Sequence, residues 1–198
     1  MAKRVYLLSE ARGLSRDLLG GKGHGLAEMA AAGLPVPPAF VVATGACRQY
    51  LRTGEVPWLL VVVRAGMAVL EGLTGKRFGL GEGKAPPLLV SVRSGAPVSM
   101  PGMMDTVLNL GLTLEGVEAL ARATGNPRFA WDSLRRLLAM YGEVVLGERP
   151  EVFEGMLSAL KAERGVGTDA ALGPEDLEEL AYRYLRHLEA RGTPFPLD

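Results

Sequence analysis

The sequence has few of the residues that define several common classes of protein. It contains a single cysteine, Cys47, which excludes an internal disulfide framework and a cysteine-based metal cluster. Its two histidines, His24 and His187, are too far apart in sequence to suggest a zinc motif. The longest apolar run, residues 58–63, ends at Arg64 and is much shorter than the roughly 20 residues of a membrane-spanning helix. We therefore expect no association with a membrane.

The sequence also has no excess of charge of either sign. Lys+Arg and Asp+Glu residues number 22 each, so the net charge is zero. Non-specific binding to nucleic acid requires a cationic surplus, so no nucleic-acid partner is expected. The first residues, MAKRVYLLSEARG, lack both a sustained apolar stretch and a small-residue cleavage site, which predicts a cytoplasmic protein. With 48% hydrophobic and 22% charged residues, the chain has the composition of a globular protein.

The composition changes near residue 112. Most of the 26 glycines precede this point and are mixed with short apolar runs and proline-rich turns. The residues that follow show one amphipathic helical pattern after another. We therefore predict an α/β (α+β) fold with two domains, residues 1–112 and residues 113–198, of which the second is helical.

The first half is predicted to mix helices and strands. In order, we expect a helix over 23–32, a strand over 39–43, helices over 44–52 and 57–72, a strand over 88–92 and a loop over 93–106. The segment 57–72 is ambiguous. Its run of three valines favours a strand, whereas the spacing of Met67, Leu70 and Leu73 favours a helix, which we prefer.

The second half contains clear signals for helix ends. Thr113 and Asn126 are suited to cap helices, and Pro127 suits the first position of a helix. Glycines mark the ends. The resulting helices cover about 113–125, 127–146, 150–165 and 174–192.

The first candidate site is the glycine cluster GGKGHG, residues 20–25. Glycines allow a ligand to approach the backbone, and the N–H groups at the start of a helix favour an anion. Lys22 adds a positive charge suited to phosphate. The cluster is not a Walker loop, because Gly23 stands where Ser or Thr would bind magnesium. The alternative is a flexible turn before a helix.

The second candidate site is SVRSGAPVSMPGMMDT, residues 91–106. An arginine at the end of a buried strand, followed by a loop rich in glycine and hydroxyl groups, is typical of ligand contacts in α/β proteins. The guanidinium of Arg93 matches the geometry of phosphate oxygens. The alternative is a methionine-rich loop that packs on the core, with Arg93 in a structural ion pair.

Other residues are weaker candidates. We expect His24 to be solvated, His187 to lie on the surface and Cys47 to be a buried small side chain. Arg128, Arg135 and Arg136 form a possible basic patch, although helical arginines more often belong to a solvated face. The acidic run at 175–179 begins a helix, where the helix dipole favours it, so no metal site is expected there.

Three segments together closely resemble the start of the pyruvate, phosphate dikinase family: LLGGKGHGLAEMAAAGLPVPPAF, LLVSVRSGAPVSMPGMMDTVLNLGL and GNPRFAWDSLRRLLAMYGEVV. The similarity extends from Lys3 to near the carboxyl end. The resemblance implies part of an ATP-grasp lobe in residues 1–112, which binds Mg-ATP, followed by the helical subdomain. In this family the β-phosphoryl group of ATP passes to a histidine on another domain and then to pyruvate.

The resemblance also implies roles for individual residues. Lys22 and Arg93 match the catalytic cations that contact phosphate, and the loop from Gly95 to Thr106 matches a glycine-rich cover over it. The implied nucleotide-contacting residues are Gly21, Lys22, Gly23, Arg93, Ser94, Gly95, Ser99, Gly102, Met103, Asp105 and Thr106. No metal ligand is assigned, because the family's magnesium-binding carboxylates, its phosphohistidine motif and its pyruvate-binding barrel are absent from this sequence.

Three functions are compatible with these features. The first is the ATP-binding portion of a pyruvate, phosphate dikinase. The second is a fragment that binds nucleotide weakly or not at all and acts with a separately encoded remainder of the enzyme. The third, a water-using dikinase or antibiotic phosphotransferase, fits the PGMMDT segment less well. A lobe that lacks its other half is also expected to self-associate through exposed apolar surface.

Overall fold

The computed structural model describes residues 3–79, 85–95 and 106–196. The contacts divide the chain into two compact units. Unit 1 comprises Met1–Gly75 and Arg93–Asp105, and unit 2 comprises Lys76–Val92 and Thr106–Asp198. The segment before β3 belongs to the helical unit, since Thr113 Oγ1 donates to the Gly79 carbonyl and Phe78 pairs with Leu88. The division into domains after residue 112 stays a prediction.

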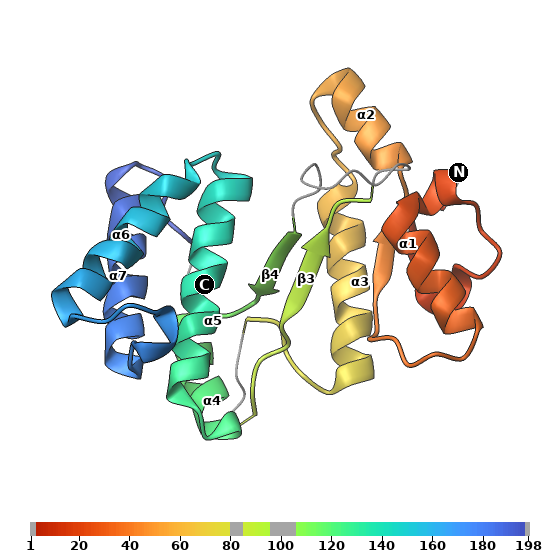
Figure 1. Cartoon of the computed structure of the whole chain (residues 1–198). Helices are drawn as coiled ribbons and strands as arrows, with labels where there is room; N and C mark the ends of the chain where they lie inside the picture. Colours follow the sequence, from red (N-terminus) through yellow and green to blue (C-terminus); the bar gives the residue numbers. More distant parts are fainter. Residues whose placement is uncertain (1–2, 80–84, 96–105, 197–198) are drawn as a thin grey trace. The chain divides into compact units, whose positions relative to one another are not determined.

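Unit 1 contains a small sheet and three helices (Figure 1). Its elements are β1 (Val5–Leu7), a 3-10 turn (Leu8–Glu10), α1 (Arg16–Ala31), β2 (Phe40–Val42), α2 (Gly45–Thr53) and α3 (Leu59–Thr74). Strands β1 and β2 are antiparallel, with Val5 opposite Val42. Helix α3 contacts β1. It also closely approaches β2, because a Cβ added at Gly66 would lie 2.7 Å from the Phe40 ring.

Unit 2 is mainly helical. Its elements are β3 (Val90–Arg93), which ends in a residue of unit 1, β4 (Thr106–Leu110), α4 (Leu114–Thr124), α5 (Pro127–Met140), a π-helical turn (Tyr141–Val145), α6 (Pro150–Arg164), a 3-10 turn (Asp169–Ala171) and α7 (Pro174–Ala190). Strands β3 and β4 form a sheet of two strands. Helices α5 and α7 lie side by side (Figure 1). Their apolar faces form the centre of a core that includes fully buried Leu134, Leu138, Leu177 and Leu180.

The capping residues explain why the later helices begin where the sequence predicts. Thr113 Oγ1 accepts a hydrogen bond of 3.0 Å from the Gly116 amide, and Asn126 Oδ1 accepts one of 2.9 Å from the Phe129 amide. Each bond satisfies a donor that the helix itself leaves unpaired. The helices predicted over 44–52 and 57–72, the strand over 39–43 and the later helices are confirmed, within a few residues at their ends. The longest difference is at 141–146, where the backbone becomes π-helical.

Three elements of the first half differ in their bounds from the predictions. The helix predicted over 23–32 corresponds to the part of α1 that follows the non-helical Gly20 and begins at Gly21, and a further helical segment from Arg16 precedes it. The strand predicted over 88–92 is confirmed with shifted bounds, since β3 runs from Val90 to Arg93 and Leu88 forms only an isolated bridge with Phe78. The segment predicted as a loop contributes Arg93 to β3 and Thr106 to β4, a strand that the sequence analysis missed.

The combination of helices with two small sheets is compatible with the predicted α/β (α+β) class. That residues 1–112 form part of an ATP-grasp lobe stays a prediction. Within the described ranges, every helix is too short or too polar to cross a lipid bilayer.

Candidate functional site

A break in α1 organises the first candidate site. Gly20 has φ 72° and ψ 167°, a conformation outside the helical region. The carbonyls just before the break are bound by Thr44 instead of continuing the helix. The Thr44 amide donates to the Leu18 carbonyl at 3.0 Å, and its hydroxyl donates to the Asp17 carbonyl at 2.6 Å. Helical dihedral angles resume at Gly21, so a new helical segment begins at the glycine cluster.

The same glycine touches the second candidate site. A Cβ added at Gly20 would lie 2.3 Å from the carbonyl oxygen of Gly95, which no side chain could tolerate. In the other direction, a Cβ on Gly95 would lie 3.6 Å from the Gly20 Cα. The two motifs, separated by more than seventy residues in sequence, are therefore in backbone contact within unit 1. Sequence reasoning singled out both motifs but did not predict this contact.

Lys22 lies in the first turn after the break and is half-buried. The N–H groups at the start of a helical segment carry partial positive charge, and Lys22 adds a full charge beside them. Gly21 is also half-buried. Gly23 has a packing role as well, because a Cβ there would lie 3.0 Å from Val41 Cγ1. This end of the segment is suited to an anion.

The strand end supplies the other cation. Arg93 is the last residue of β3 and is exposed, as is Ser94, whereas Gly95 is half-buried against Gly20. In the described part of the chain Arg93 has no ion-pair partner, so the structural ion pair considered as an alternative is not observed there. Thr106 is half-buried at the start of β4. The remaining predicted contacts lie outside the described residues: Ser99, Gly102, Met103 and Asp105.

Two of the weaker candidates differ from their predictions. Cys47 is exposed on α2, not buried. His187 is not a free surface residue, because its Nε2 lies 3.0 Å from Glu148 Oε2 and its ring packs edge-on against Phe153. The hydrogen bond with His187 is the main cause that lowers the pKa of Glu148. His24 has a side chain 27% exposed and approaches Glu28 at 3.8 Å, on the next helical turn.

The arginines of α5 do not form a basic patch. The side chain of Arg135 is buried and Nη2 lies 2.7 Å from Asp132 Oδ1, the carboxylate that Arg136 also binds. Arg128 donates to the carbonyls of Leu172 and Asp169. These arginines hold unit 2 together, and the solvated-face expectation is wrong for Arg135.

The acidic run at the start of α7 has a structural role. Arg164 of α6 donates to Asp176 and Glu179, each at 2.6 Å. This hydrogen bonding is the main reason that the pKa of Asp176 is lowered. Within the described ranges, no three or more His, Cys, Asp or Glu side chains cluster in a way that could hold a metal ion.

The segment that contains the glycine cluster matches a family of known proteins. Residues 16–68 match the family model described as "Pyruvate phosphate dikinase, AMP/ATP-binding domain". The match includes the α1 break, Lys22 and Thr44 but ends before β3.

Similarity to whole proteins covers almost the entire chain. The chain is 49% identical to the pyruvate, phosphate dikinase of Clostridium symbiosum over 200 residues, which are 99% of this chain and 22% of that protein. It is 48% identical to the pyruvate, phosphate dikinase of Rhizobium meliloti over 205 residues, which are 100% of this chain and 22% of that protein. It is 45% identical to the pyruvate, phosphate dikinase of Entamoeba histolytica over 199 residues, which are 99% of this chain and 22% of that protein. The chain thus spans about 22% of the length of these curated relatives. It is a relative of the pyruvate, phosphate dikinases, and its residues 16–68 carry the similarity to their AMP/ATP-binding domain.

Proposed function

We propose that unit 1 binds the phosphate chain of ATP between the glycine cluster of α1 and the end of β3, as the ATP-binding portion of a pyruvate, phosphate dikinase. The observation that carries this proposal is the backbone contact between Gly20 and Gly95, because it joins the only two motifs that the sequence marks as phosphate contacts. The match of residues 16–68 to an AMP/ATP-binding domain supports the choice of nucleotide.

Each part of the site has a distinct role in the proposal. The backbone N–H groups of Gly21, Lys22 and Gly23 face phosphate oxygens at the start of the helical segment. Lys22 and Arg93 neutralise the charge that develops during transfer, which is the main contribution that proteins make to phosphoryl transfer. Ser94 and Gly95 extend the proposed contact with the phosphate chain. The proposed cover over the phosphates is the loop that includes Ser99, Gly102, Met103, Asp105 and Thr106.

Magnesium belongs to this proposal only as a companion of ATP. The described residues offer no cluster of carboxylates to hold it. As the family resemblance implies, its protein ligands are proposed to lie in parts of a dikinase outside this sequence.

The complete reaction is a further part of the proposal. ATP, phosphate and pyruvate would give AMP, diphosphate and phosphoenolpyruvate, with the phosphoryl group passing first to a histidine on another domain. Since the chain spans about 22% of its relatives, the second candidate function is a fragment that acts only with a separately encoded remainder. The two candidate functions are distinguished by mixing the chain with such a polypeptide and assaying the formation of phosphoenolpyruvate. If the chain acts with a separate remainder of the enzyme, activity should appear only when both polypeptides are present.

The proposed phosphate contacts are tested by calorimetric titration of Mg-ATP. We expect the Lys22→Ala/Arg93→Ala double variant to bind at least about 100-fold more weakly than the unmutated chain, because hydrogen bonds to charged groups contribute ~1.5–3 kcal/mol each. The matched control is Arg12→Ala/Arg52→Ala, which removes two exposed cations of unit 1 from positions outside the site. Equal weakening in the control, or no binding by the unmutated chain, would contradict the proposal.

A further inference from the structure

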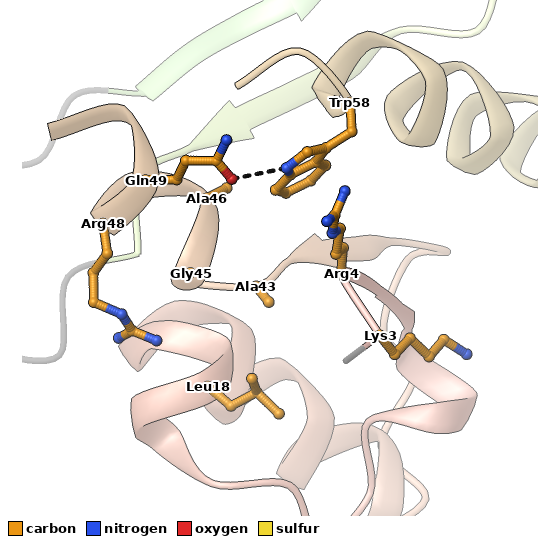
Figure 2. Close-up of a pocket in the computed structure, with 9 residues that line it drawn as sticks. All are labelled: Lys3, Arg4, Leu18, Ala43, Gly45, Ala46, Arg48, Gln49 and Trp58. Atoms are coloured by element: carbon orange, nitrogen blue, oxygen red, sulfur yellow. Dashed lines mark hydrogen bonds between the residues drawn. The ribbon is translucent and has the colours of Figure 1, made fainter. Parts of the chain in front are cut away.

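Thr44 connects the end of β2 to the start of α2 and reaches the first helical segment of α1. Leu18 of that segment and the two neighbours of Thr44 in sequence, Ala43 and Gly45, line one cavity of about 290 Å³ (Figure 2). Thr44 is half-buried. Its hydroxyl binds the backbone of Asp17, which is 27 residues away in sequence. A residue outside the glycine cluster thus contacts the backbone that leads into the cluster.

Thr44 donates two hydrogen bonds to the carbonyls that precede the break in α1. Its hydroxyl donates to the Asp17 carbonyl at 2.6 Å, and its amide donates to the Leu18 carbonyl at 3.0 Å. In an uninterrupted α-helix each carbonyl accepts from the amide four residues further on, so these two carbonyls would accept from the amides of Gly21 and Lys22. Thr44 therefore takes the place of those two donors.

The Thr44 hydroxyl does not serve the helix that Thr44 begins. A threonine at the start of a helix usually accepts a hydrogen bond from an amide two or three residues further on. Thr113 at the start of α4 accepts such a bond from the Gly116 amide at 3.0 Å. The Thr44 side chain accepts none from α2. The contrast indicates that the hydroxyl of Thr44 stabilises the broken conformation of α1.

This arrangement bears on the amides that begin the second helical segment of α1. The first amides of a helical segment have no acceptor within that segment. After the break at Gly20 these are the amides of Gly21, Lys22 and Gly23. The carbonyls one turn earlier, which could compete for the first two amides, already accept from Thr44. Amides without a protein acceptor are the groups that bind an anion at the start of a helix.

We propose that Thr44 is a positioning residue of the nucleotide site described under the proposed function. It acts by occupying the Asp17 and Leu18 carbonyls, so that the amides one turn later stay free for the ligand. Thr44 does not touch the ligand in this account, and its effect passes through the backbone of α1. The inference rests on the proposed function, because it requires the phosphate chain to bind at the start of the second helical segment.

The effect on the backbone is tested without nucleotide, by amide hydrogen exchange measured with NMR at Gly21. Thr44→Val removes the hydroxyl, so the Asp17 carbonyl becomes available to the Gly21 amide. We expect exchange at Gly21 to slow by about fivefold, the effect of one added hydrogen bond. A general loss of stability would instead speed this exchange, so the direction distinguishes a positioning role from a merely structural one. Thr44→Ser keeps the hydroxyl and should exchange as the unmutated chain does.

The effect on the ligand is tested by calorimetric titration of Mg-ATP into the same variants. We expect Thr44→Val to bind about fivefold more weakly, because the ligand and the Asp17 carbonyl then compete for one amide. Thr44→Ser should bind as the unmutated chain does. The matched control is Thr53→Val, which removes a hydroxyl that donates to the Gln49 carbonyl within α2 at 2.9 Å and should leave the affinity unchanged. Thermal unfolding checks that each variant folds.

The outcomes separate this inference from the proposed function. Equal Mg-ATP affinity in Thr44→Val and the unmutated chain would overturn the role of Thr44, and Lys22→Ala/Arg93→Ala then shows whether the phosphate site itself holds. If the unmutated chain does not bind Mg-ATP, the proposed function fails and the exchange at Gly21 alone decides whether Thr44 controls this amide. Exchange that is unchanged or faster in Thr44→Val would overturn the inference. Equal weakening of Mg-ATP binding in Thr44→Ser or Thr53→Val would overturn it as well.

Discussion

Gly20 combines two constraints that only glycine satisfies. Its φ of 72° lies in a region that other residues avoid, and its Cα hydrogen occupies the space in which a Cβ would meet the Gly95 carbonyl oxygen at 2.3 Å. The position therefore determines both the break in α1 and the contact between the two proposed phosphate-binding motifs. A side chain here must displace the end of β3 or straighten the helix.

Replacing Gly20 should consequently damage both stability and binding. We expect Gly20→Ala to lower the free energy of unfolding by about 2 kcal/mol or more, from the strained dihedral angle and the backbone clash together. Mg-ATP binding should weaken as well, since Gly95 and Arg93 can no longer keep their positions. Urea denaturation and calorimetric titration measure the two effects.

Gly25 provides the matched control on the same helix. Nothing lies within 4 Å of a Cβ added there, and its φ is not in the positive region. Gly25→Ala should therefore leave stability unchanged or raise it by up to about 1 kcal/mol, the ordinary gain from alanine in a helix. If Gly20→Ala proved as stable as Gly25→Ala, the close approach to Gly95 would be refuted.

At the scale of elements, α5 is attached to α7 through a buried charged network. Arg135 is bound to Asp132 on the preceding turn and lies beside Tyr184 of α7. The Tyr184 hydroxyl donates to the Phe153 carbonyl of α6 at 2.9 Å, and burial raises the pKa of Tyr184 to about 12. Three helices thus meet at one polar centre within an otherwise apolar core.

Removing the carboxylate from this centre should leave an uncompensated buried cation. We expect Asp132→Asn to lower the free energy of unfolding by about 3 kcal/mol at neutral pH. Burial alone would raise the pKa of Asp132, but the hydrogen bonds and charges of Arg135 and Arg136 outweigh it and lower the pKa from the usual 3.8. The folded state therefore binds this proton less readily than the unfolded state does.

The pH dependence of the free energy of unfolding follows from this lowering of the Asp132 pKa. A lowered pKa contributes stability that is complete above the ordinary value of 3.8 and is lost as the pH falls through the lowered value. The difference in unfolding free energy between the unmutated chain and Asp132→Asn should therefore be largest above pH 5 or so and should shrink in acid. Arg136→Gln, which removes an exposed partner of the same carboxylate, should cost less than about 1 kcal/mol. A difference independent of pH would contradict this account.

The boundaries of the later helices could be predicted because their signals are local. Thr113 and Asn126 accept hydrogen bonds from amides three residues further on, and Pro127 occupies the first position of its helix, so the sequence alone specifies the start of α4 and α5. The burial of Arg135 could not be predicted in this way. It depends on α7, which lies about fifty residues further along the chain.

The candidate site likewise has features that the sequence could predict and features that it could not. Lys22 and Arg93 were identifiable from residue type and the surrounding glycines. The break at Gly20 and its contact with Gly95 depend on a pairing of distant segments, and a glycine in a helix gives no indication of its partner.

At the scale of the whole molecule, unit 1 exposes much apolar surface along α3. Val61 is 70% exposed and Leu73 is 65% exposed, with Ala65, Ala68 and Val69 between them on the same side of the helix. Spacings of three, four and seven residues form a continuous stripe, the pattern of a helix face that packs against another surface. A stripe of this kind favours association once it is free in solution.

We therefore expect the chain to self-associate as its concentration rises, through the stripe on α3. Light scattering should show a mean mass above that of the 21.1 kDa monomer, and an apolar dye should bind. Val61→Glu/Leu73→Glu should restore the monomer and reduce dye binding, because two charges on the stripe cannot be buried against a second copy. Leu51→Glu is the control, since Leu51 is 78% exposed on α2, outside the stripe. A monomer at every concentration, or equal effects of both variants, would show that the stripe does not drive association. The exposure of the apolar stripe on α3 would then need an explanation other than contact between two copies of the chain.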